Sequence, residues 1–278
     1  TYSVRAKMYL RENIWIMNLD LKGKTAIVCG STQGIGKAAA EELSKLGANL
    51  VLIARNEEAL QASVTELVNS GDQAHSYVVA DFSNPQNVKT AIDSYVSEGG
   101  DCHILINNTG GPKGGAIKDA TVAEFLSAFN QHLICNHILM QSLTPLMIKN
   151  GYGRIINVIS TSVKQPLPNL GVSNTIRGAV ANWSKTLANE LGGYGITVNN
   201  VLPGATNTSR LKSIAGVKSE LTGQSVDDIF SEMGAESPMK RIAEPEEVGA
   251  TIAFLASPAA GYINGINVPV DGGRTKSL

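Results

Sequence analysis

The sequence is poor in several kinds of residue whose abundance would place it in a particular class. Only three cysteines, Cys29, Cys102 and Cys135, occur in 278 residues, and they lie far apart among apolar neighbours. A sparse and odd set argues against a disulfide framework and favours reduced, packed thiols in a cytoplasmic protein. The four histidines show no metal-ligand spacing, so we expect no metal site.

A large excess of one charge is also missing. Lys and Arg number 23 against 24 Asp and Glu, which gives a formal net charge of -1 at pH 7. A nucleic acid or an anionic membrane as partner would call for a basic excess, so neither is expected. No apolar run reaches the roughly 18–20 residues that cross a bilayer. The remaining composition, 43% hydrophobic and 17% charged, is that of an ordinary soluble globular protein.

The first sixteen residues, TYSVRAKMYLRENIWI, lack the continuous apolar core and the small-residue cleavage site of a secretory signal. Met17, followed by NLDLKGKTAIV, resembles a natural start. We therefore interpret residues 1–16 as a tag or an upstream extension. No repeat, low-complexity tract or linker divides the rest, so residues 17–278 are expected to form a single domain.

Short apolar runs alternate with amphipathic segments along this domain. The runs are rich in Val and Ile and barely alternate in polarity, as is typical of parallel strands buried on both faces. They predict strands at 25–30, 49–54, 75–80, 103–107, 154–160, 196–202 and 266–270. Helices are predicted at 35–46, 57–69, 85–97, 122–149, 173–191 and 245–256. The alternation predicts a Rossmann-like α/β fold, a doubly wound parallel sheet of about seven strands with helices on both faces.

One segment, 205–240, interrupts this alternation. It is too long for an ordinary connection between a helix and a strand, and it contains short helical patterns of its own. Excursions beside the carboxyl ends of strands commonly act as lids or substrate loops, so we interpret it as a substrate loop or lid. The alternative is a surface insertion without a role. Its mixture of Leu, Ile, Met and Ser weakly favours a partly apolar substrate.

A glycine-rich turn, GSTQGIG at 30–36, follows the first predicted strand. Gly30, Gly34 and Gly36 allow a tight turn, a close approach of the backbone to a pyrophosphate and tight packing of the next helix. That helix offers free N–H groups and its positive dipole end to phosphates. Such a triplet between the first strand and first helix of a βαβ pattern predicts a dinucleotide site, against the alternative of a plain tight turn. Further cofactor contacts are expected from Ser31, Thr32 and Ile35.

The end of the second predicted strand selects the cofactor. The sequence there is LIARNEE, with Arg55 and Asn56 where an acidic residue would hold the ribose diol of NAD. A guanidinium suits a 2′-phosphate, so we predict NADP(H) rather than NAD(H); the alternative is a solvated Arg at a helix start. Asp81, after the third predicted strand, could bond adenine or cap the following helix.

With these elements in order, the chain resembles the short-chain dehydrogenase/reductase family, most closely its β-ketoacyl reductase-like members. The resemblance covers about residues 20–273. It rests on GSTQGIG (30–36), NNTG (107–110), GRIINVIS (153–160), NNVLPGATNT (199–208) and VDGG (270–273). It implies a dinucleotide-dependent oxidoreductase that forms a homo-oligomer, a tetramer or a dimer. It also implies cofactor contacts from Asn107, Gly110, Arg177, Pro203, Gly204, Thr206 and Thr208.

The same resemblance implies a catalytic set of Asn, Ser, Tyr and Lys, of which only the serine is matched, by Ser160. Ser173 stands at the tyrosine position, Arg177 at the lysine position and His132 at the asparagine position. An alkyl hydroxyl is a far weaker acid than a phenol that a neighbouring cation brings toward neutrality. Arg177 can still clasp a ribose diol, but it does not readily pass a proton. Cofactor binding should therefore persist, whereas the proton source has changed.

Other proton donors remain open at this point. The imidazole of His132 titrates near neutral pH, so it could relay or donate a proton, or it could simply be packed in a helix. Lys164 and a water ordered by the two serines and Arg177 are further candidates.

Two functions follow from these residues. The first is an NADP(H)-dependent oxidoreductase that moves a hydride between nicotinamide and a carbonyl or alcohol, such as a β-ketoacyl compound or another ketone. The second is a catalytically silent NADP-binding sensor or scaffold, which the missing tyrosine suggests. A hydro-lyase or isomerase is a weaker third hypothesis because no acid–base pair of residues is evident. A small-molecule substrate is the partner expected of the first.

Overall fold

The computed structural model describes residues 17–69 and 71–277. The interpretation of residues 1–16 as an extension lies outside these residues. Among the described residues, no helix has both the length and the apolar character needed to span a membrane.

Seven parallel strands form one sheet, in the order β3-β2-β1-β4-β5-β6-β7. They are β1 (Thr25–Cys29), β2 (Asn49–Ala54), β3 (Ser76–Val79), β4 (Ile104–Asn107), β5 (Gly153–Val158), β6 (Ile196–Pro203) and β7 (Asn267–Val270). The chain builds outward from β1 to β3, then crosses back to β4 and builds the other half. The strand order therefore reverses between β1 and β4, and a crevice for ligands opens at the carboxyl ends of the strands there. The predicted doubly wound parallel sheet is confirmed.

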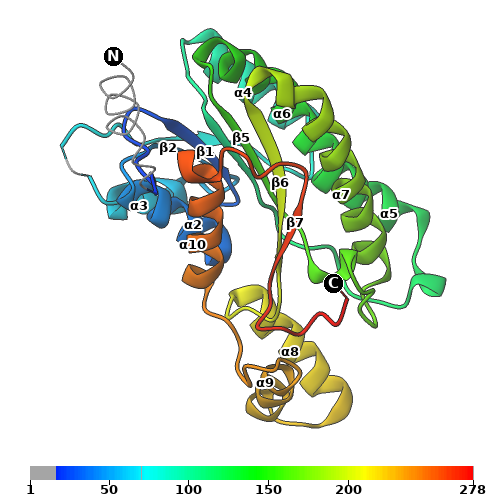
Figure 1. Cartoon of the computed structure of the whole chain (residues 1–278). Coiled ribbons are helices and arrows are strands. Elements are labelled where there is room, and N and C mark those ends of the chain that lie inside the picture. Colours follow the sequence, from blue (N-terminus) through cyan, green and yellow to red (C-terminus); the bar gives the residue numbers. More distant parts are fainter. Residues whose placement is uncertain (1–16, 70, 278) are drawn as a thin grey trace, which may run out of the picture.

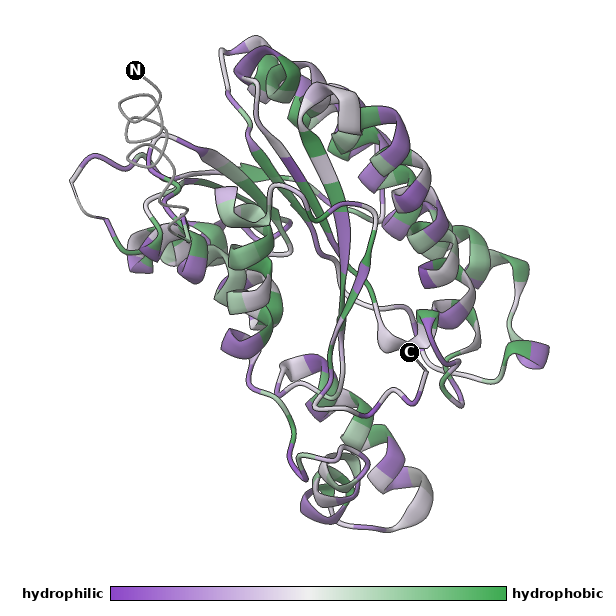
Figure 2. Ribbon diagram, viewed as in Figure 1, coloured by the Kyte–Doolittle hydropathy of each residue, from purple (hydrophilic) through white to green (hydrophobic). Residues whose placement is uncertain are grey.

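Helices cover both faces of the sheet (Figure 1). One face carries α2 (Gly34–Lys45), α3 (Glu57–Glu66) and α10 (Pro245–Ala256), and the other carries α4 (Pro85–Ser97), α6 (Cys135–Asn150) and α7 (Gly171–Leu191). Each face has its own apolar core, built from strand residues that alternate between the two sides. Figure 2 shows these strands largely in the hydrophobic colour, whereas the helices carry polar residues outward. The predicted layers therefore follow from burial on both faces.

The three cysteines, Cys29, Cys102 and Cys135, lie in the core as free thiols, as the sequence predicts. Burial raises the pKa of Cys135 to about 12 and raises the pKa of the other two as well. These thiols are therefore packing groups.

The single helix predicted at 122–149 is divided. The structure has α5 (Val122–Phe129), which begins with a capping box between Thr121 and Glu124, then a π-helical turn, η2 (Asn130–Ile134), and then α6. A π turn widens the helix by one residue and rotates the side chains that follow it. Short 3-10 turns complete the chain: η1 (Ile117–Asp119), η3 (Thr161–Val163), η4 (Gly192–Tyr194) and η5 (Pro258–Ala260).

Two helices form within segment 205–240: α8 (Ser209–Thr222) and α9 (Val226–Ala235). The side chains of Thr208 and Ser225 cap their first turns. Figure 1 shows this pair standing apart from the other helices, beyond the carboxyl ends of the strands. The short helical patterns predicted for this segment are thus present, beside the crevice.

Candidate functional site

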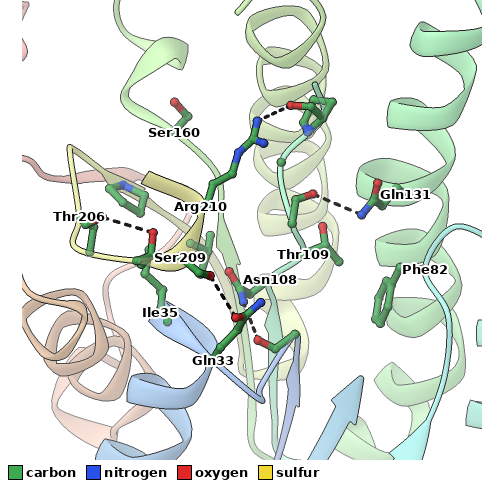
Figure 3. A pocket seen from close by; sticks show the side chains of 18 of the residues that line it. Gln33, Ile35, Phe82, Asn108, Thr109, Gln131, Ser160, Thr206, Ser209 and Arg210 are labelled. Atoms are coloured by element: carbon green, nitrogen blue, oxygen red, sulfur yellow. Dashed lines mark hydrogen bonds between the residues drawn. The ribbon is translucent and has the colours of Figure 1, made fainter. Parts of the chain in front are cut away.

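A cleft of about 480 Å³ opens at the carboxyl ends of the strands (Figure 3). Its walls are the turn after β1, the ends of β2 and β3, the loop after β4, the end of β5, the first turns of α7 and the segment from β6 into α8. Most of the predicted site residues line it: Gly30, Thr32, Gly34, Ile35, Arg55, Asp81, Gly110, Ser160, Ser173, Arg177, Pro203, Gly204, Thr206 and Thr208. Local sequence patterns along the whole chain therefore converge on one place.

The turn after β1 requires its glycines. Gly30 and Gly34 have φ angles of +59° and +55°, a backbone conformation that residues with a Cβ rarely adopt. A Cβ on Gly36 would lie 2.1 Å from the carbonyl oxygen of Gly30, so any other residue would push α2 away from the turn. The free N–H groups at the start of α2 face the cleft, and no acidic residue occupies its first turn. This end of the cleft fits the diphosphate of a dinucleotide. Ser31 is buried beneath the turn and does not line the cleft.

Arg55 lies at the end of β2 with an exposed side chain, and it forms no ion pair within the described part of the chain. Asp81, at the end of β3, accepts a hydrogen bond of 2.9 Å from the backbone N–H of Ser83. Hydrogen bonds from Ser83, with a smaller contribution from Arg55, lower the pKa of Asp81. The cap of α4 is Asn84, so Asp81 is left facing the cleft.

Asn107, from which a cofactor contact was expected, does not line the cleft. Its side chain is buried and donates a 2.8 Å hydrogen bond to Oδ1 of Asn157 on the neighbouring strand β5. The next residue, Asn108, lines the cleft and bonds the carbonyl oxygens of Cys29 and Gly30. Successive side chains of an extended strand point in opposite directions, and the pattern alone did not reveal which of the two faces the cleft.

Ser160 follows β5, which ends two residues earlier than predicted, and starts η3. Its Oγ accepts a hydrogen bond of 3.1 Å from the N–H of Ser162, which leaves the Ser160 proton free to be donated into the cleft. Ser173 and Arg177 lie one turn apart on α7 and both line the cleft. The three residues that stand at the serine, tyrosine and lysine positions therefore meet as predicted.

Arg177 is buried, with 7% of its surface exposed, and its Nη1 donates a 3.0 Å hydrogen bond to the carbonyl oxygen of Val158. Burial, together with the nearby positive charge of Arg210, lowers the pKa of Arg177 to about 10. The guanidinium therefore remains a cation at neutral pH.

His132 lies in the π turn η2, is buried and does not line the cleft. Its Nδ1 is 2.6 Å from Oγ1 of Thr109, while Nε2 has no partner. Burial, reinforced by the charge of Arg177, lowers the pKa of His132 to about 2. The imidazole is therefore neutral at physiological pH, and the near-neutral titration that suggested it as an acid is lost. Its hydrogen-bond partner among the described residues, Thr109, does line the cleft.

Several lining residues were missed. Gln33 accepts a 3.0 Å hydrogen bond from Ser209, Gln131 donates to the carbonyl oxygen of Gly110, and Arg210 donates through Nη2 to that of Pro112, at 2.6 Å (Figure 3). One signal for Arg210 was available. A basic residue in the first turn of a helix opposes the helix dipole, so it needs another reason to be there.

Comparisons with known proteins agree with this geometry. Residues 30–275 match a family profile described as enoyl-(acyl carrier protein) reductase. The NADPH-dependent reductase BacG of Bacillus subtilis is 30% identical over 256 residues, 92% of this chain and 99% of BacG. The 3-oxoacyl-(acyl-carrier-protein) reductase FabG of Vibrio cholerae is 31% identical over 257 residues, 92% of this chain and 98% of FabG. The crystal structure of L-sorbose reductase from Gluconobacter frateurii, complexed with NADPH and L-sorbose, is 32% identical with a TM-score of 0.88, covering 94% of this chain and 100% of that one.

Proposed function

The chain belongs to the short-chain dehydrogenase/reductase family of oxidoreductases, and we propose that it reduces a carbonyl compound with NADPH in the cleft at the carboxyl end of the sheet. The observation that carries the proposal is the meeting, in one cleft, of the glycine turn, Arg55 and Ser160. BacG, FabG and L-sorbose reductase are named as reductases, and the first is NADPH-dependent. These relatives support both the reaction type and the coenzyme.

The residues present fit NADP(H). The N–H groups at the start of α2 would bind the diphosphate, and the unpaired guanidinium of Arg55 would bind the 2′-phosphate. Bound in the cleft, the coenzyme would supply the hydride. The remaining contacts that we propose come from Thr32, Ile35, Asp81, Gly110, Arg177, Pro203, Gly204, Thr206 and Thr208.

The chain's own residues would then prepare the carbonyl group. Because Oγ of Ser160 accepts a hydrogen bond from Ser162, its O–H remains available as a donor. The hydroxyl would donate a hydrogen bond to the carbonyl oxygen and so orient the substrate. Arg177 places a fixed positive charge in a buried setting, where it stabilises negative charge that develops on that oxygen. The proton would come from water through the hydroxyls of Ser160 and Ser173, because no titrating acid stands beside them.

This arrangement favours substrates whose carbonyl is already activated. General acid assistance is typically worth about 10²–10⁴-fold in rate, and neither serine supplies it as a tyrosine would. A ketone next to an electron-withdrawing group needs less of this assistance. We therefore place the substrate among activated ketones.

Turnover of NADPH tests the proposal. The purified protein is mixed with NADPH and a panel of ketones and diketones, and the nicotinamide absorbance is followed. Ser160→Ala should lower kcat by about 100-fold or more while leaving the affinity for NADPH unchanged, since Ser160 faces the carbonyl. Thr175→Ala, which removes an exposed hydroxyl elsewhere on α7, is the control and should have no effect. NADPH binding without reduction of any ketone would contradict the proposal and would instead indicate a sensor or scaffold.

A further inference from the structure

Besides Arg55, two further guanidinium groups line the cleft. Arg177 enters from α7 and Arg210 from the first turn of α8, and neither forms an ion pair within residues 17–69 and 71–277. Among the described residues that line the cleft, Asp81 carries the one carboxylate, and it stands at the end of β3, beside Arg55. The protein therefore provides positive charge around Ser160 and leaves it unmatched.

The Arg210 side chain lies near the reacting groups and away from the glycine turn. Its guanidinium reaches the loop after β4, donating to Pro112 and passing over Gly111, where a Cβ would lie 3.7 Å from Nε. In Figure 3 it extends away from Gln33 and toward the end of the cleft that holds Ser160. Ser209 points the opposite way, to Gln33. Two adjacent residues therefore serve opposite ends of the cleft: Ser209 faces the glycine turn, and Arg210 faces the end that holds Ser160.

The position of Arg210 is electrostatically unfavourable in the free protein. It stands at the positive end of α8, whose first turn contains no acidic residue, and such a placement opposes the helix dipole. It also lies close enough to Arg177 for the like charges to repel, which contributes to the lowered pKa of Arg177. Within the described part of the chain, its acceptor is the carbonyl oxygen of Pro112, which is uncharged. An anion in the cleft would relieve both repulsions.

We propose that the substrate is an oxo acid and that Arg210 binds its carboxylate while Ser160 and Arg177 face its ketone. This inference rests on the proposed reductase function. A planar carboxylate matches the paired N–H donors of a guanidinium, of which Arg210 commits one to Pro112. Leu170, Leu211 and Ile214 line the same cleft and would contact the carbon skeleton of such an acid. The coenzyme diphosphate is the other oxyanion within reach of this chemistry, so the experiment must separate the two.

The test compares acids with their esters. Wild type, Arg210→Gln and Lys212→Gln are assayed with NADPH on 2-oxobutanoate and 2-oxo-4-phenylbutanoate and on the methyl ester of each. Lys212 is an exposed cation on α8 that does not line the cleft, so its variant controls for a general loss of charge. Arg210→Gln should lower kcat/KM by about 10- to 100-fold on the acids and by less than about twofold on the esters. Lys212→Gln should match wild type.

Three results would overturn the inference. Wild type could use acids and esters equally well. The acid-to-ester ratio could be the same in Arg210→Gln as in wild type. Arg210→Gln could weaken NADPH binding, measured by fluorescence titration, without changing that ratio, which would assign Arg210 to the coenzyme diphosphate.

A binding measurement keeps this test separate from the proposed function, should none of the ketones be reduced. Saturation-transfer NMR is recorded on the NADP⁺-saturated protein with 4-phenylbutanoate and with its methyl ester. A stronger signal from the acid in wild type and Lys212→Gln, lost in Arg210→Gln, would support the anion site although turnover had failed. Equal signals from acid and ester in wild type would overturn it.

Discussion

Titratable side chains are scarce where the reaction would occur. Among the described residues, no His, Cys, Lys or Tyr lines the cleft. Burial lowers the pKa of His132 so that it is uncharged at neutral pH, and hydrogen bonds from Ser83 hold the pKa of Asp81 below its usual range. Arg177, with its pKa lowered to about 10, is the group whose charge changes nearest to working conditions. Catalysis at this site is therefore expected to rely on fixed charge and hydroxyl groups.

The pH profile should show this directly. With an uncharged ketone ester as substrate, kcat/KM for reduction should stay level from about pH 5 to pH 9, because no His, Cys, Lys or Tyr is among the described residues that line the cleft. It should fall as the pH rises through about 10, because deprotonation of Arg177 removes the positive charge that stabilises the reacting oxygen. The measurement is steady-state kinetics in buffers of constant ionic strength. A titration limb between pH 6 and 8 would contradict water as the proton source and would indicate a titrating side chain in its place.

Ser173 and Arg177 can be converted back to the family pattern. The double change Ser173→Tyr with Arg177→Lys places a phenol beside a cation, and a phenol is a much better proton donor than an alkyl hydroxyl. We expect kcat on simple, unactivated ketones to rise by about 10-fold or more. The single variant Ser173→Phe, which adds the ring without its hydroxyl, should bring no such gain. An unchanged rate in the double variant would mean that the cleft is organised around different chemistry.

At the scale of helices and strands, local patterns predict most of what is present. Short Val- and Ile-rich runs give all seven strands, because burial on both faces leaves a direct trace in composition. The π turn at 130–134 leaves no such trace, because the apolar pattern runs through it and its hydrogen bonding is set by packing against neighbours. The prediction at 122–149 is therefore right that these residues are helical and wrong that they form one uninterrupted helix.

Four strands are joined side to side by asparagines, of which the first three are buried and the last is half-buried. Asn107, Asn157, Asn200 and Asn267 stand in register on β4, β5, β6 and β7, and each donates an amide hydrogen bond to the next. Asn157 also donates to Oγ of Ser184 on α7, at 2.6 Å. On β4 and β5 the residues that follow this asparagine ladder, Asn108 and Val158, line the cleft. The ladder ties α7, which carries Ser173 and Arg177, to the strands that end there.

Breaking the ladder at its centre should be costly. Asn157→Leu keeps the volume but leaves Nδ2 of Asn107 without its acceptor and Oγ of Ser184 without the donor Asn157, in a buried layer. It also removes one of the two donors to Oδ1 of Asn200, the other being Ser184. We expect a loss of about 2–5 kcal/mol in the free energy of unfolding, measured by urea denaturation. Asn182→Leu, at an exposed position on α7, should stay within about 0.5 kcal/mol of wild type. A change of similar size in both variants would contradict a structural role for the ladder.

At the scale of the whole molecule, the cleft is assembled from segments far apart in sequence. The glycine turn and Ser160 were predictable because each belongs to a local pattern with a fixed spacing. The contact of Arg210 with Pro112 joins residues 98 positions apart. It depends on the path of the loop after β4 and on where α8 begins, and the sequence specifies neither. That Asn108 lines the cleft, and not Asn107 as expected, has a similar origin. It depends on where β4 ends relative to the neighbouring strands. The sequence therefore does not predict which side chains point into the cleft, because that depends on tertiary structure.

Because the cleft draws on both halves of the sheet, coenzyme binding should stabilise the entire domain. A ligand at about 100 times its Kd adds about 2.7 kcal/mol to the free energy of unfolding. For a domain of this size we expect a rise in Tm of roughly 5–10 °C with NADPH in differential scanning calorimetry. NADH at the same concentration should raise Tm less, because it gives Arg55 no 2′-phosphate to bind. In Arg55→Ala the two coenzymes should become equivalent, whereas Lys118→Ala, an exposed cation that does not line the cleft, should retain the difference. An unchanged Tm with every form of both coenzymes would remove the basis for a dinucleotide site.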